Sequence, residues 1–154
     1  MGNKITLKVG VLVVFRGKLL LIKEKSSYDN QYHWNIIKGT YEPGRDRSLI
    51  ETAEREAKEE AGATIKTLQL FNVFEVEKNK KTIIQVNFLA NSKNKSRLTD
   101  QHQQKKRDED IIEIKLFNRE TLRKMKRKDF INERAYITVR NWITDRKGLF
   151  KPLF

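Results

Sequence analysis

The chain contains no cysteine among its 154 residues. Without thiols it cannot form disulfides, use a thiolate nucleophile or hold zinc through sulfur, and their absence fits a reducing compartment. Long apolar runs are also missing, since no stretch approaches the ~20 residues that cross a bilayer. Residues 1–4 lack the apolar core of a signal peptide. We therefore expect a soluble, cytoplasmic protein that has no membrane partner.

Internal repeats and linkers are absent as well, which bears on the domain count. A length of 154 residues is that of one ordinary domain. Hydrophobic residues make up 38% of the chain and include eight Phe and two Trp, enough to build one core. We therefore expect a single domain over residues 1–154. The sequence carries no signal for the oligomeric state.

Acidic residues are few compared with basic ones, and the net charge is +13. Residues 1–90 hold 15 basic and 11 acidic residues, whereas residues 91–154 hold 18 and 9. A positive field raises the local concentration of polyanions, so nucleotides, inositol phosphates and RNA are all candidate partners. A solubilising surface explains the same charge equally well.

Apolar periodicity predicts strands that alternate with helices. The expected strands cover residues 5–15, 19–22, 34–37, 65–76, 82–90 and 111–117. The first of them is apolar on both faces, as in a central strand covered by two layers. An amphipathic helix over 132–145 would cover the sheet. A basic helix over 119–128 would begin at Asn118 as its N-cap.

Two further expectations concern the strands and the loop of the second half. In the strand 65–76 we expect Phe71 and Val73 in the core, and Phe74 and Glu75 facing outward. Residues 91–107 are low in apolar side chains and predict a mobile loop, in which His102 is solvated.

Three glutamates lie on one edge of the helix that ends at Gly62, a typical C′ glycine. At about 100° per residue, Glu56, Glu59 and Glu60 fall within an arc of roughly 100°. Their mutual repulsion would become attraction around a divalent cation, because hard Mg²⁺ prefers oxygen ligands. An ordinary solvated helix has the same composition, so the cluster alone does not define a metal site.

The neighbouring stripe of this helix is made mostly of small side chains, which would let the helix sit close to a sheet. The stripe consists of Ile50, Ala53, Ala57 and Ala61. The carboxylates would then lie at the rim of the buried face. Arg55 is expected to pair with Glu51 and Glu59, each four residues away.

A glycine-flanked loop precedes the helix, and the two together resemble a known motif. Residues 38–44, KGTYEPG, form a compact turn. The stretch 39–63 resembles the Nudix box of the Nudix hydrolases, G-x5-E-x7-R-E-U-x-E-E-x-G-U with U aliphatic. Gly39, the segment 42–44 and the segment 55–63 match it in order.

Two features depart from the box. The spacing between Gly39 and Arg55 is two residues longer than in the pattern. The first glutamate of the box falls on a basic residue, which is Arg45 when counted from the turn and Arg47 when counted back from Arg55. The half of the box that holds the family's metal ligands is intact, apart from alanine at both aliphatic positions.

The resemblance implies a fold, a reaction and a cofactor. The fold is a Nudix-type α/β/α sandwich, in which a mixed sheet lies between the box helix and a C-terminal helix. The reaction is hydrolysis of a nucleoside diphosphate linked to another moiety, with Mg²⁺, or Mn²⁺, as cofactor. The implied metal ligands and catalytic groups are Glu56 and Glu60, Glu59 as third ligand or base, Arg55, and the backbone of Gly39. Glu109 or Glu113 is an alternative base or metal ligand.

The substrate of such an enzyme would be small and rich in phosphate. The Lys38-Gly39 pair resembles the dinucleoside polyphosphate and diphosphoinositol polyphosphate hydrolases, which favours long phosphate chains contacted by Lys38, Arg45 and Arg47. Tyr32 in the polar loop 26–33 is a candidate for stacking on a base, and Tyr41 in the box loop is a further candidate contact. The alternatives are an RNA 5′ pyrophosphohydrolase and a catalytically silent domain that binds a nucleotide or RNA.

Overall fold

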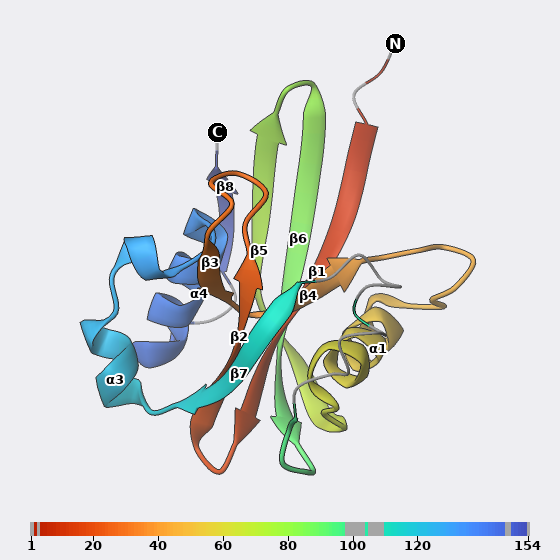
Figure 1. Cartoon of the computed structure of the whole chain (residues 1–154). Helices are drawn as coiled ribbons and strands as arrows, with labels where there is room; N and C mark the ends of the chain where they lie inside the picture. The colour runs from red at the N-terminus through yellow and green to blue at the C-terminus, as the bar shows by residue number, and fades with distance from the viewer. Residues whose placement is uncertain (1, 3, 98–103, 105–109, 147–148, 154) are drawn as a thin grey trace.

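Eight strands form one mixed sheet in the computed structural model, which describes residues 2, 4–97, 104, 110–146 and 149–153 (Figure 1). The strands are β1 (Lys4–Phe15), β2 (Lys18–Lys25), β3 (Tyr32–Asn35), β4 (Ile37–Thr40), β5 (Ile65–Lys78), β6 (Lys81–Ser92), β7 (Ile111–Phe117) and β8 (Leu149–Leu153). Their order is β3-β2-β1-β6-β5-β8, with β4 also paired to β1 and β7 to β2. The pairs β1–β6 and β5–β8 are parallel, and the other pairs are antiparallel.

Helices cover the sheet on two opposite sides (Figure 1). Helix α1 (Leu49–Ala61) packs on one face together with Val9, Val11 and Val13 of β1. Helices α3 (Arg119–Lys124) and α4 (Glu133–Ile143) pack on the other face, where Leu12 of β1 joins their core. This confirms the predicted α/β/α sandwich, and it explains why β1 is apolar on both faces.

The helix ends follow the predicted capping residues. Asn118 accepts a hydrogen bond from the backbone of Thr121 and begins α3, and Gly62 ends α1 in the left-handed conformation at φ 60°. The predicted helix over 119–128 is shorter than expected, because α3 ends at Lys124 and is followed by the 3₁₀ turn η1 (Arg127–Asp129).

Burial differs from the expectation at Ile50 and at Phe74. Ile50 is 46% exposed, since Leu49, one position earlier, makes the contact of the first turn with the core. Phe74 is buried although alternation placed it outward. The register between β5 and β6 shifts between Leu70 and Asn72, so that Phe74 follows the buried Asn72 on the inward face.

The sheet contains one strand that the sequence analysis did not predict. β8 has no counterpart among the expected strands, and it extends the sheet by pairing with β5. His102 and most of the expected loop 91–107 lie outside the described residues. No helix in the described part of the chain is both long and apolar enough to span a membrane.

Candidate active site

A cleft of about 950 Å³ lies beside the acidic edge of α1 and reaches β1, β4 and the start of α4. Its acidic lining residues are Glu24, Glu42, Glu56, Glu59, Glu60 and Asp110. Its basic lining residues are Lys8, Lys25, Lys38, Arg45, Arg55, Lys78 and Arg134. A second cavity of about 290 Å³ lies near Trp142, and none of the described residues that line it is a carboxylate. Chemistry that needs both charge signs therefore belongs to the larger cleft.

The acidic edge is more buried than the helical wheel predicts. Glu56 is 6% exposed and Glu60 4% exposed, so both lie within the buried face of α1 and not at its rim. Gly39 on β4 makes this burial feasible, because a Cβ at position 39 would overlap the Glu56 carboxylate. The backbone N–H of Lys38 donates to Glu60 Oε2 at 3.4 Å. Strand β4 therefore fixes where two of the three carboxylates lie.

Substitution of Gly39 by alanine is expected to displace the Glu56 side chain, since a Cβ and the carboxylate cannot share this space. Overpacking of this kind destabilises a protein by roughly 1–3 kcal/mol. We expect Gly39→Ala to lower the free energy of unfolding by that amount, as measured by urea denaturation. It should also reduce kcat for the pyrophosphate-bond hydrolysis that the resemblance to the box implies. Gly44→Ala is the control, because nothing lies within 4 Å of a Cβ at that position. Equal kcat for Gly39→Ala and the native protein would contradict the expectation.

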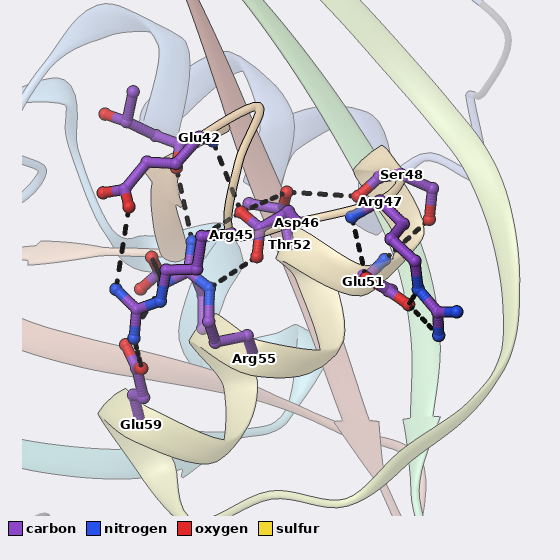
Figure 2. Close-up of polar contacts among 11 residues, drawn as sticks. Glu42, Arg45, Asp46, Arg47, Ser48, Glu51, Thr52, Arg55 and Glu59 are labelled. Atoms are coloured by element: carbon purple, nitrogen blue, oxygen red, sulfur yellow. Dashed lines mark hydrogen bonds and ion pairs between the residues drawn. The ribbon is translucent and has the colours of Figure 1, made fainter.

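Arg55 is the centre of an ion-pair network that joins the box loop to the helix (Figure 2). Its Nε and Nη2 donate to the two oxygens of Asp46, both at 2.8 Å. Its Nη1 donates to Glu56 at 2.8 Å and to Glu59 at 3.3 Å. This confirms the predicted pair with Glu59. The predicted pair with Glu51 is wrong, because Glu51 accepts from Arg47 instead.

Asp46 is the main partner of Arg55, and sequence reasoning missed it. Thr52 Oγ1 also donates to Asp46, at 3.0 Å. The hydrogen bonds from Arg55, together with that from Thr52, hold the pKa of Asp46 well below its usual value, although burial opposes them. The same pair raises the pKa of Arg55. Asp46 lies between Arg45 and Arg47, the two basic residues that align with the first box glutamate. An acidic residue at this place was the signal in the sequence that could have identified the partner of Arg55.

The two basic residues beside Asp46 have different surroundings (Figure 2). Arg45 lines the cleft and its Nη2 lies 2.7 Å from Glu59 Oε1. Arg47 pairs with Glu51 at the start of α1 and is not among the described residues that line the cleft. Of these two predicted substrate contacts, only Arg45 therefore lies in the cleft.

Of the other three predicted substrate contacts, one lines the cleft and two do not. Lys38 lines the cleft, and its Nζ lies 3.2 Å from Glu24 Oε1. Burial disfavours the charged form of Lys38, but Glu24 and Glu60 outweigh burial and raise its pKa. Tyr41 packs against the core beneath α1, and the Tyr32 hydroxyl donates to Asp110 at 3.3 Å. Neither tyrosine is among the described residues that line the cleft.

The two candidate bases outside the box lie around the start of β7. Glu109 lies outside the described residues. Glu113 is exposed on β7, opposite Lys23 of β2, and is not among the described cleft residues. Asp110, between them in sequence, does line the cleft.

Several cleft residues had no individual place in the sequence-based site, among them Lys8, Glu24, Tyr28 and Arg134. Lys8 and Arg134 have lowered pKa values because burial disfavours their charged forms. Tyr28 is 92% exposed, with the Lys78 ammonium 6.0 Å from its ring centroid. These residues come from β1, β2, the following loop and α4, and only the fold brings them together.

The carboxylates of α1 decide whether the cleft can hold a divalent cation. In the part of the chain that the structure describes, no three histidine, aspartate or glutamate side chains are grouped closely enough to enclose a metal ion. Mg²⁺, however, is usually held by one or two carboxylates, and its other positions go to water and substrate phosphates. Glu56 and Glu60, both at the cleft, supply such a donor set. The residues present therefore fit a magnesium ion shared with a phosphate substrate.

Comparison with known proteins identifies the family. The model of the NUDIX domain matches residues 4–139. No curated protein sequence matches the chain. A NUDIX hydrolase from Nitrosomonas europaea superposes with a TM-score of 0.72 at 18% identity, over 96% of this chain and 92% of that chain. A MutT NUDIX hydrolase from Burkholderia pseudomallei superposes with a TM-score of 0.68 at 17% identity, over 90% and 98%.

A third structural neighbour carries a ligand. The NUDIX domain of Shewanella oneidensis NrtR, crystallised with ADP ribose, superposes with a TM-score of 0.68 at 14% identity, over 93% of this chain and 90% of that chain. At these identities the structural neighbours support the fold alone. The family model, which spans most of the chain, supports more: the chain belongs to the Nudix family and is a hydrolase acting on pyrophosphate bonds.

Proposed function

We propose that this protein is a Mg²⁺-dependent pyrophosphohydrolase that cleaves a nucleoside diphosphate linked to another moiety, with a nucleoside or dinucleoside polyphosphate as its substrate. The observation that carries the proposal is that one cleft is lined both by the carboxylates of α1 and by a group of cations. The acidic side is the edge of α1, and the basic side includes Lys8, Lys38 and Arg134. Phosphoryl transfer needs mainly positioning and charge neutralisation, and these two sides supply both.

The acidic side has distinct roles in this proposal. Glu56 and Glu60 are metal ligands, Glu59 is the third ligand or the general base, and the backbone of Gly39 is a further donor. The bound metal would neutralise phosphate charge and activate the attacking water. Water would attack phosphorus in line, and the bond from that phosphorus to the bridging oxygen would break.

Two other groups would support this chemistry. Arg55 holds Glu56 and Glu59 in place through its Nη1, so it acts as a positioning residue of the acidic side. Glu109 is the alternative general base, since the family's base does not always lie in the box.

The nucleoside is assigned to the end of the cleft near Tyr28. This ring is exposed, and the backbone N–H of Tyr28 donates to Ser26 Oγ at 3.1 Å, which steadies the loop that presents it. Exposed aromatic rings stack on bases regardless of base identity. The ADP ribose held by the NrtR NUDIX domain supports a nucleotide-like substrate.

A substrate panel with and without metal tests the proposal. The panel contains dinucleoside polyphosphates, nucleoside triphosphates, nucleotide sugars, ADP-ribose and diphosphoinositols, each with Mg²⁺ or Mn²⁺. We expect hydrolysis of at least one nucleotide and complete loss of turnover in excess EDTA, restored by added Mg²⁺, because the carboxylates alone cannot neutralise the phosphates. The readout is phosphate and nucleotide release. Turnover that survives EDTA would contradict metal dependence.

RNA is a second candidate substrate, favoured by five exposed cations outside the cleft: Arg123, Lys124, Lys126, Arg127 and Lys128. A 5′-triphosphorylated oligomer is therefore included in the panel. Faster cleavage of the oligomer than of a free nucleotide, with binding that weakens steeply as salt rises, would favour RNA. Binding without cleavage of any compound would favour the catalytically silent alternative.

A further inference from the structure

The basic side of the cleft is assembled from three elements far apart in sequence. Lys8 lies on β1, Lys38 on β4 and Arg134 in the first turn of α4, and all three line the cleft. The sheet register places Lys8 beside Thr40 of β4 and beside Gln85 of β6. Lys38 is paired with Glu24, whereas neither Lys8 nor Arg134 has an ion-pair partner among the described residues.

Arg134 is anchored in the protein interior by a chain of buried polar side chains. Its Nε donates to Gln85 Oε1 at 2.9 Å. Gln85 Nε2 donates to Asn87 Oδ1 at 2.9 Å, and Asn87 Nδ2 donates to Asn72 Oδ1 at 2.7 Å. Thr138 Oγ1 accepts from both asparagines at 3.3 Å. This series of hydrogen-bonded side chains thus runs from the cleft to the interface between the sheet and α4.

Every member of this chain is buried, and the hydrogen bonds fix their orientations. Gln85, Asn87, Asn72 and Thr138 are at most 2% exposed. Burying an amide side chain is unfavourable unless its donors and acceptors make hydrogen bonds. Apolar side chains at these positions would avoid that requirement, yet the protein has polar ones. Because Gln85 must donate to Asn87, its carbonyl oxygen faces Arg134. The buried chain therefore presents one fixed acceptor to the guanidinium.

Gly10 on β1 provides the room for this arrangement. A Cβ at position 10 would overlap the Asn87 side-chain oxygen and crowd Ile36. The register places Gly10 beside Asn87 on β6 and beside Lys38 on β4. The central strand thus lets the polar chain lie directly against the sheet, next to the basic side of the cleft.

The guanidinium of Arg134 has donors left over for a ligand. Among the described residues, only its Nε has a hydrogen-bond acceptor, which leaves the two terminal amino groups at the cleft. A cation in the first turn of a helix is disfavoured by the helix dipole, so its position is not explained by helix stability. A guanidinium with a fixed orientation matches pairs of phosphate oxygens, and it remains charged even when partly buried.

We infer that Arg134, Lys8 and Lys38 form a binding site for a phosphate chain, and that Gln85 orients Arg134 within it. The inference rests on the proposed function, which places a diphosphate at the acidic side of the same cleft. A diphosphate with a divalent cation needs little additional positive charge. The additional cations Lys8 and Arg134 therefore favour substrates that carry three or more phosphoryl groups in a chain.

Binding of inorganic tripolyphosphate in EDTA tests the site by titration calorimetry. We expect Arg134→Ala to raise Kd by roughly 10- to 100-fold, because it removes charge-assisted hydrogen bonds to the anion. Arg134→Lys should recover only part of the affinity, since an ammonium lacks the planar fork. The charge-matched control is Arg146→Ala, an exposed residue beyond the end of α4 and outside the cleft. Native affinity in Arg134→Ala, or an equal loss in Arg146→Ala, would overturn the site.

A double-mutant cycle tests the role of Gln85 as a positioning residue. Gln85→Leu alone should raise Kd several-fold, and it should have no further effect in the Arg134→Ala background. A purely structural role would weaken binding equally in both backgrounds, and this result would overturn the assignment. If Gln85→Leu fails to fold, Gln85→Glu keeps an acceptor for Arg134 and adds a compensating charge. It should weaken tripolyphosphate binding too, and unchanged binding would count against the inference.

The test separates this inference from the proposed function. Binding in EDTA requires neither metal nor hydrolysis. Native affinity in Arg134→Ala would therefore remove the phosphate-chain site even if the protein hydrolyses nucleotides. Absence of metal-dependent hydrolysis would remove the proposed function and leave the affinity differences intact.

Discussion

Replacement of Glu60 by glutamine is expected to lower kcat by roughly 100- to 1,000-fold, the loss that follows removal of one element of transition-state charge stabilisation. Glu60 is buried at the cleft, close to Lys38 and one turn from Glu56. Glutamine preserves the shape of the side chain and its contact with the Lys38 backbone, but removes the negative charge that a divalent cation needs. The measurement is kcat on the best substrate of the panel at saturating Mg²⁺.

Helix α1 also supplies a control for this experiment, away from its acidic edge. Glu54 lies on the same helix, is exposed, and is not among the described residues that line the cleft. Glu54→Gln changes the net charge by the same amount and should leave kcat unchanged. Glu56→Gln should behave like Glu60→Gln. A Glu60→Gln variant that folds, as shown by its thermal unfolding, and keeps native kcat would exclude this carboxylate from the reaction.

The part of the site that lies on α1 could be predicted because it depends on local geometry. The helical period fixes the relative directions of Glu56, Glu59 and Glu60, and Gly62 fixes where the helix ends. The depth of the carboxylates could not be predicted. Their burial depends on Gly39, which lies on another element and has no side chain to fill the space. A helical wheel contains no information about the surface on which the helix packs.

The basic side of the cleft could not be predicted, since its members have ordinary sequence surroundings. Lys8 is one polar residue in an alternating strand, and Arg134 is one of many basic residues in the second half of the chain. What distinguishes Arg134 is its bond to Gln85, across 49 residues. The strands of the sheet could likewise be predicted, but the register shift between β5 and β6 near Phe71 could not. This shift buries Phe74 and has no strong local signal in the sequence.

Asp46 gives the second large expected effect, this time on stability. Asp46→Ala would leave Arg55, which is mostly buried, without the carboxylate that accepts from its Nε and Nη2. Breaking such a pair by removing one partner costs about 3 kcal/mol or more. For a chain of this length, that loss lowers Tm by roughly 6–12 °C. Since Arg55 also holds Glu56 and Glu59, kcat should fall as well. Asp145→Asn is the control, because its pair with Arg119 is exposed and worth about 0–1 kcal/mol.

The pH dependence of unfolding distinguishes loss of this ion pair from a general packing defect. Arg55 holds the pKa of Asp46 below its ordinary value of 3.8, so the folded protein binds fewer protons at this site than the unfolded chain. The pair therefore contributes its full stability above that value and loses it as the pH falls through the folded pKa. Urea denaturation should show a constant stability difference between the native protein and Asp46→Asn above about pH 5, and a shrinking difference below pH 4. A difference that stays constant down to pH 2 would mean that the charge of Asp46 does not hold Arg55.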